Sequence, residues 1–200
     1  MTKLQKLSPD EQNELNGRLI DVAQNGITKE VQRLLADGAN VYGNDDWVLR
    51  WAAKDGHTEA VKILLEAGAD VRALDDYPLR YAALHGHTEI VKVLLAAGAN
   101  VHAHGDGALF MAACRGHTET LRVLSNHIFA PDSWRGKSRT EIEAYATALH
   151  DKIKVDIFWP ERLHMTATIL ADCAIDCWHQ VRPPPPKLRI SPLPAQPRPL

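Results

Sequence analysis

Residues 78–101 read PLRYAALHGHTEIVKVLLAAGANV. Leu79, Ala82 and Ala83 follow the spacing of one helical face, and the small alanines allow neighbouring helices to approach closely. Gly86 then predicts a helix end with positive φ, and a second, more apolar helix follows from Thr88. Gly98 predicts the end of that helix in the same way. The stretch therefore predicts two short helices and a turn.

The same pattern recurs every 30 residues along the first two thirds of the chain. The tetrapeptide Gly-His-Thr-Glu occurs at 56–59, 86–89 and 116–119, and Gly-Ala-Asn/Asp-Val occurs at 38–41, 68–71 and 98–101. Leucine recurs in phase as Leu19, Leu49, Leu79 and Leu109. One such unit cannot bury its apolar surface alone, but a stack of units can. The repeat therefore predicts an elongated array of helix pairs.

Local capping signals refine the expected helix boundaries. Asp75 and Asp76 are expected to cap free N–H groups at the start of the first helix, and Pro78 suits its first turn. Thr88 is expected to cap the second helix, with Glu89 at its positive end.

These motifs resemble the ankyrin repeat, whose family pattern is T-P-L-H-x-A-A-x-x-G-H-x-E-V-V-K-L-L-L-x-x-G-A-D-V-N. The resemblance covers about residues 16–127, and it implies an all-α, ankyrin-type solenoid of about four helix-turn-helix repeats. The period of 30 residues is three shorter than the usual one, and the missing residues fall between Val71 and Pro78, where the family builds a β-hairpin finger. We therefore expect no extended fingers. The short form is similar to arrays of giant viruses and some bacteria.

The remaining segments define the expected domain organisation. Residues 1–15 are expected to form an N-terminal cap, with a capping box at Ser8 and Glu11, and residues 16–128 the repeats. Residues 129–138 are expected to form a loop, and the rest of 129–181 two helices. This segment is either a helical cap on the last repeat or a recruitment segment that makes the chain a substrate adaptor for a ubiquitin-ligase component. Residues 182–200 are expected to be a proline-rich, basic and disordered tail.

Composition excludes several classes of protein. The 200 residues carry 23 Lys and Arg against 25 Asp and Glu, so a globally basic nucleic-acid binder is excluded. Three cysteines do not make a disulfide framework. The sequence contains neither a secretory signal nor a membrane-spanning apolar stretch. We expect a cytoplasmic protein, or one in a host's cytoplasm or nucleus if it is a viral or bacterial effector.

Patterns that indicate catalysis or cofactor binding are weak. No phosphate-binding, dinucleotide-binding, nucleophile-elbow or zinc-protease motif occurs. Cys173 and Cys177, and Cys114 near His117, leave open a metal- or thiol-dependent enzyme only as an outlier. We predict no catalytic residue, no metal, no cofactor and no small-molecule substrate.

The expected function is therefore binding of an unidentified protein, not of nucleic acid or membrane. The resemblance implies a concave face lined by the first helices and the turns. Aromatic and arginine side chains are favoured at the centres of protein interfaces. The alternative for Arg50 and Arg80 is a structural pairing with Asp45, Asp46, Asp75 or Asp76. The predicted partner-binding residues are Trp47, Arg50, Lys54, Asp55, Tyr77, Arg80, Leu84, His85 and Arg115.

Overall fold

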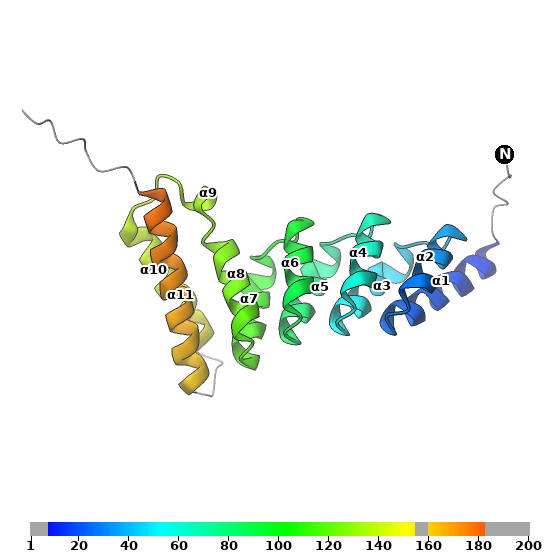
Figure 1. Cartoon of the computed structure of the whole chain (residues 1–200), viewed down its shortest axis with the longest axis horizontal. Helices are drawn as coiled ribbons and strands as arrows, with labels where there is room; N and C mark the ends of the chain where they lie inside the picture. The colour runs from blue at the N-terminus through cyan, green and yellow to red at the C-terminus, as the bar shows by residue number, and fades with distance from the viewer. Residues whose placement is uncertain (1–7, 155–159, 183–200) are drawn as a thin grey trace, which may run out of the picture.

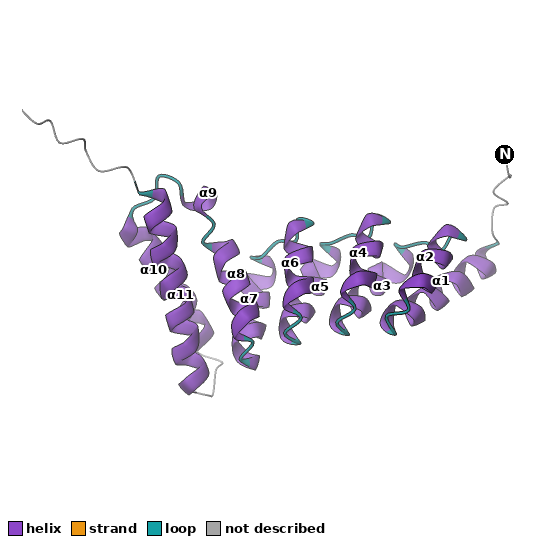
Figure 2. Ribbon diagram, in the orientation of Figure 1, coloured by secondary structure: helices purple, strands orange, loops and turns teal. Residues whose placement is uncertain are grey.

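A computed structural model describes residues 8–154 and 160–182, apart from the side chains of 43–46 and Pro160. This part of the chain contains eleven helices and no strand (Figure 2). The helices are α1 (Pro9–Gln24), α2 (Thr28–Ala36), α3 (Gly43–Lys54), α4 (Thr58–Glu66), α5 (Ala73–Leu84), α6 (Thr88–Ala96), α7 (Ala103–Arg115), α8 (Thr118–Ile128), α9 (Pro131–Trp134), α10 (Arg139–Lys154) and α11 (Pro160–Val181).

The helices are stacked side by side in an elongated array (Figure 1). The first helices of the repeats, α1, α3, α5 and α7, form one row, and the second helices, α2, α4, α6 and α8, form another. The four in-phase leucines are fully buried between the rows. The predicted fold, an all-α ankyrin-type solenoid with a helical C-terminal extension, is confirmed.

A histidine from each following repeat closes the glycine turn of the preceding one. Nε2 of His87 lies 2.9 Å from the carbonyl oxygen of Lys54, and its ring packs on Gly56, whose φ is +86°. His57 and His117 repeat this contact at distances of 2.7 and 3.0 Å. The glycines are required here because a Cβ atom would overlap the histidine ring.

The shortened turns at the start of α5 and α7 contain a brief left-handed segment. In α5 the residues Leu74, Asp75 and Asp76 have φ between +52° and +58°, and His104–Asp106 adopt the same conformation in α7. The chain reverses direction here without extending into a finger, as the three-residue deletion predicted.

The side-chain caps predicted at Asp75, Asp76 and Thr88 were wrong, whereas Glu89 lies in the first turn of α6 as predicted. Neither α5 nor α6 has a side-chain hydrogen bond at its N-cap. Asp76 is buried and instead accepts a hydrogen bond from the backbone N–H of Asn100 in the next repeat, at 2.7 Å. Thr88 donates to the carbonyl of Gly86 and contacts the Thr120 hydroxyl at 2.7 Å. Neither side chain forms its hydrogen bonds with the free N–H groups at the start of its own helix. Both bind groups in turns or in the next repeat, and they therefore link these parts of the array.

The C-terminal helices continue the array beyond repeat four. Helix α11 packs along α8, and α10 packs on α11 (Figure 1). Ile142, Leu149, Leu170 and Ala174 are buried in this arrangement. The predicted loop at 129–138 contains the short helix α9, in which the indole N–H of Trp134 donates to the Ile128 carbonyl at 2.9 Å.

Two cations of this extension occupy places that a fifth repeat would occupy. Arg162 packs on Gly116 and donates to the carbonyl oxygen of Cys114, as His87 does on Gly56 and Lys54. Lys152 donates to the Gly105 carbonyl at 2.7 Å and to the Asp106 carboxylate at 3.0 Å. None of the helices in the described part of the chain combines the length and the apolar character that a membrane crossing needs.

Candidate functional site

The first helices present a row of aromatic and cationic side chains on one face of the array, which we call the inner-helix face. Successive repeats place equivalent positions on neighbouring helices, so α3, α5 and α7 contribute in register. The inner-helix face contains Trp47, Arg50, Trp51 and Lys54 of α3, Tyr77, Arg80, Tyr81 and Leu84 of α5 with His85 after it, and Phe110, Met111 and Arg115 of α7.

Arg50 joins the aromatic residues of two repeats. Its guanidinium carbon lies 4.0 Å from the ring centroid of Tyr77 and 5.2 Å from that of Trp47. The rings of Tyr77 and Tyr81 are stacked with their centroids 3.8 Å apart. A hydrogen bond to the Tyr77 hydroxyl, with burial, raises the pKa of Tyr81. These contacts hold Arg50 and the two tyrosines in one continuous layer.

Arg80 is held by the left-handed turn of its own repeat. Its Nε and Nη2 donate to the carbonyl oxygens of Asp75 and Leu74, at 3.2 and 3.3 Å. The predicted alternative, a pairing of Arg80 with the carboxylate of Asp75 or Asp76, is wrong, because those carboxylates bind other groups. For Arg50 the corresponding side chains, Asp45 and Asp46, lie outside the described residues.

Charged side chains gather where the first helices end. Lys54 lies over the Trp51 ring, with its Nζ 4.1 Å from the centroid. The pKa of His85 is lowered by burial first and then by electrostatic repulsion from His87, Lys54 and Arg115, while Asp55 partly opposes this. His85 is therefore mostly neutral at pH 7, and Lys54 and Arg115 provide the positive charge at this end.

The structure places the remaining predicted residues as follows. Trp47 is exposed over 43% of its surface, and Asp55 is exposed just after α3. Leu84 is half-buried, and its carbonyl oxygen accepts the hydrogen bond of His117. All nine predicted residues lie on α3, α5 and α7 or directly after them.

Sequence reasoning missed a groove at the C-terminal end of the inner-helix face. It has a volume of about 280 Å³ and lies between α7 and α10. Phe110 and Met111 line it from one side, and Leu149 and Ile153 from the other. The two helices are about forty residues apart in sequence, and no local pattern indicates that they meet. Phe110 did carry a signal, since it replaces the arginine of the two preceding repeats.

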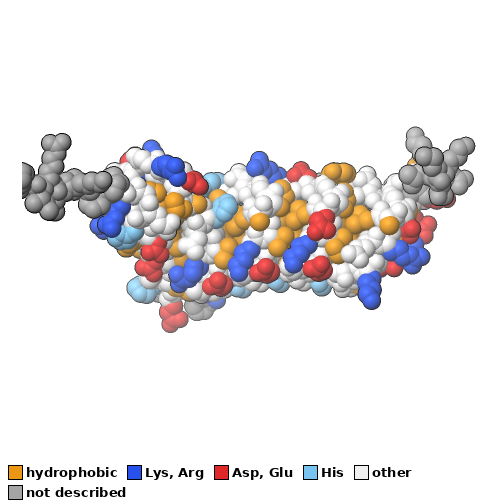
Figure 3. Space-filling view, turned by 45° about the horizontal axis from the view of Figure 1, so that its top comes forward, with side chains coloured by type: hydrophobic (Ala, Val, Ile, Leu, Met, Phe, Trp, Pro, Cys, Tyr) orange, Lys and Arg blue, Asp and Glu red, His pale blue; other side chains and the backbone are white. Residues whose placement is uncertain are grey.

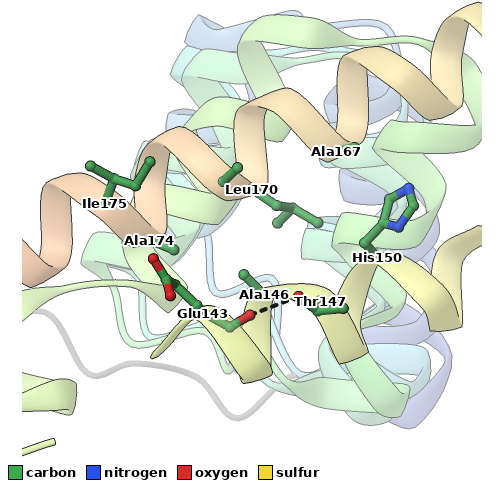
Figure 4. A pocket seen from close by; sticks show the side chains of 9 residues that line it. Glu143, Ala146, Thr147, His150, Ala167, Leu170, Ala174 and Ile175 are labelled. Carbon is green, nitrogen blue, oxygen red and sulfur yellow. Dashed lines mark hydrogen bonds between the residues drawn. The ribbon is translucent and has the colours of Figure 1, made fainter. Parts of the chain in front are cut away.

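A second groove, of about 430 Å³, lies between α10 and α11 (Figure 4). Ala146, Leu170 and Ala174 form its floor, and His150 stands at one end with a buried Nε2 that has no hydrogen-bond partner in the described part of the chain. Glu143 stands near the other end and is paired with Arg139 at 2.7 Å. The groove is an apolar hollow in the last layer of the array.

Cys173 and Cys177 do not form a reactive site. Cys173 is buried and donates to Oδ1 of Asn126 at 3.1 Å, and burial raises its thiol pKa to about 11. Burial also raises the pKa of Cys177. Both thiols therefore resist forming the thiolate that a nucleophile or metal ligand needs. Among the described residues, His, Cys, Asp and Glu form no group of three or more that could hold a metal ion.

The comparisons with known proteins agree with the geometry of the array. A family model described as ankyrin repeats (3 copies) matches residues 19–105, 49–133 and 79–151. The matches together span more than half of the chain and include α10. No curated protein matches the sequence.

Proposed function

Because the chain belongs to the ankyrin repeat family, we propose that it is a non-enzymatic module that binds a partner protein through the inner-helix face. Ankyrin repeats are generally protein–protein interaction modules. The observation that carries the proposal is the layer formed by Arg50, Trp47 and Tyr77, which continues through Tyr81. It is held in place before any partner arrives, so binding costs little side-chain ordering.

The outer surface of the second helices carries different side chains from the inner-helix face, and this difference supports the inner-helix face as the binding site. Figure 3 shows Lys and Arg side chains beside Asp and Glu side chains along these helices. Lys62 pairs with Glu59 and Lys92 with Glu89, each at 3.5 Å. Such exposed pairs within one helix are solvated and contribute little to recognition. The inner-helix face holds the side-chain types that dominate measured interface energies.

For residues 129–181 we propose the role of a helical cap. Ile142, Leu149 and Leu170 are buried when α10 and α11 close repeat four, and Arg162 occupies the position of a repeat histidine. These contacts use the apolar side chains that a recruitment segment would offer to a ligase component. The role of a helical cap therefore has more support than that of a substrate adaptor for a ubiquitin-ligase component.

Affinity purification from the native cell, with quantitative mass spectrometry, tests the proposal. A Lys54→Glu, Tyr77→Ala, His85→Ala variant should lose the partners that the unaltered protein retains. A Lys62→Ala, Lys92→Ala variant on the outer surface should retain them. Circular dichroism and melting must show that both variants fold. Unchanged partners in the inner-face variant would place the binding site elsewhere.

A further inference from the structure

The cations of the inner-helix face differ from those of the outer surface in their partners. On the outer surface Arg33, Lys62 and Lys92 each lie within 3.5 Å of a glutamate one turn away. Arg50, Lys54 and Arg80 lie on aromatic rings, and none of them pairs with a carboxylate of a described residue. A ring face attracts a cation without neutralising it, so Lys54 and Arg80 keep their positive charge available.

Arg50 and Arg80 are fixed in orientations suited to a carboxylate. Nε of Arg50 is buried, so the terminal nitrogens of its guanidinium are the donors left for a partner. Arg80 is anchored by two backbone carbonyls, which leaves part of its planar fork for another acceptor. A guanidinium held in this way binds carboxylates with paired N–H donors.

The apolar groove between α7 and α10 opens directly beside Arg80. Position 107 of α7 corresponds to Trp47 and Tyr77 in the preceding repeats, but it is glycine. A Cβ atom at 107 would lie 3.0 Å from Cδ of Arg80, so the arginine stem lies over the glycine. Position 107 therefore adds no ring to the groove, whose walls include the half-buried Phe110.

We propose that the partner contributes an acidic peptide segment with one bulky apolar residue. The apolar side chain fills the groove between α7 and α10, and neighbouring carboxylates bind Arg80 and Arg50. This inference rests on the proposed function, because it names the class of partner for the same face. The groove volume of about 280 Å³ suits a single large side chain.

A peptide fits this face better than a nucleic acid does. The groove is lined by Phe110, Met111, Leu149 and Ile153 and suits one apolar side chain, which a peptide supplies and a nucleic acid does not.

A peptide-display selection tests the inference on the full-length chain. Random peptides of about 16 residues are selected on the protein, and the affinities of synthetic versions are measured by fluorescence anisotropy. We expect enrichment of Asp and Glu around a Phe, Leu, Met or Trp. An Arg50→Gln, Arg80→Gln variant should bind at least about tenfold more weakly, with a smaller salt dependence.

Matched variants separate charge from shape. The Lys62→Gln, Lys92→Gln variant removes the same charge from the outer surface and should change affinity by less than about twofold. Phe110→Ala should remove one wall of the groove and weaken binding without changing charge. If Phe110→Ala fails to fold, the arginine variant still decides the question.

The outcomes distinguish this inference from the proposed function. Selected peptides that lack acidic residues but lose binding on Tyr77→Ala would overturn the partner class and leave the binding face intact. Peptides that bind every inner-face variant equally would overturn both. Selection of no peptide, or binding only of a single-stranded oligothymidylate of about 20 nucleotides, would overturn the inference.

Discussion

At the scale of single residues, buried acceptors link the repeats through backbone N–H groups. Oδ1 of Asn16 accepts from the N–H of Asn40 at 2.8 Å, and Oδ1 of Asp76, sixty residues later, accepts from Asn100 at 2.7 Å. This position of the repeat therefore requires a hydrogen-bond acceptor but not a charged side chain. Burial raises the pKa of Asp76, against the lowering effects of Asn100 and Arg72.

We expect Asp76→Asn to stabilise the protein at pH 7. Asparagine keeps the acceptor, as Asn16 does, removes the buried charge, and tolerates the left-handed conformation at φ +56°. Because the folded pKa is raised, the stability provided by the aspartate falls as pH rises from about 3.8 through the folded value. The advantage of asparagine should therefore grow over this window and then level off.

Melting temperatures measured from acidic to neutral pH check this prediction. Asp76→Ala, which removes the acceptor and leaves the Asn100 N–H unsatisfied, serves as the control and should cost about 1–2 kcal/mol. A lower melting temperature for Asp76→Asn than for the unaltered protein at pH 7 would show that the charge itself stabilises the turn.

Thiol reactivity gives a second prediction at this scale. With a pKa of about 11 against an ordinary 9.0, Cys173 at pH 8 should react with iodoacetamide about a hundredfold more slowly in the folded protein than in denaturant. Mass spectrometry of the labelled peptides measures both rates in one sample. Equal rates would mean that the interface between α8 and α11 opens readily.

At the scale of the elements, the histidines are what join one helix pair to the next. We expect His87→Ala to lower the free energy of unfolding by about 1–2 kcal/mol, because it leaves the Lys54 carbonyl without its donor and uncovers Gly56. His85→Ala is the matched control, since that side chain is exposed and should cost less than about 0.5 kcal/mol. Denaturant unfolding measures both values. Equal losses would contradict a joining role for His87.

Helix α11 allows a similar comparison of matched residues. Leu170 is 1% exposed and Ile175, on the same helix, is 39% exposed. Leu170→Ala should therefore cost about 2–4 kcal/mol, whereas Ile175→Ala should cost less than about 1 kcal/mol. If Leu170→Ala is tolerated as well as Ile175→Ala, α10 and α11 do not form a packed layer.

The sequence predicted the repeat helices well because their signals are local and periodic. Leu79, Gly86 and Gly98 mark the faces and ends of one unit, and the period extends them to all four. The partners of Asp76 and Thr88 could not be predicted in this way, since they lie in the next repeat and cap no helix. The short α9 was missed because four residues carry no periodicity.

At the scale of the whole molecule, the candidate site combines local and distant contributions. The composition of the inner-helix face was predictable, since Arg50 and Tyr77 occupy repeated positions on first helices. Its groove was not, because α10 is held beside α7 through its packing on α11, which itself packs on α8. The same packing brings Lys152 to Asp106. The C-terminal helices thus complete both the core and the proposed binding face.

Removal of residues 129–200 is therefore expected to damage the array as a whole. Repeat four would lose the Arg162 donor at the Cys114 carbonyl, and the buried side chain of Ile128 would become exposed. The melting temperature should fall by at least about 5 °C, and the exposed apolar flank should promote self-association and binding of a hydrophobic dye. Differential scanning calorimetry, light scattering and dye fluorescence measure these effects. A truncated protein that stays monomeric and melts at the original temperature would show that four repeats suffice, and that α10 and α11 serve another purpose than closing the stack.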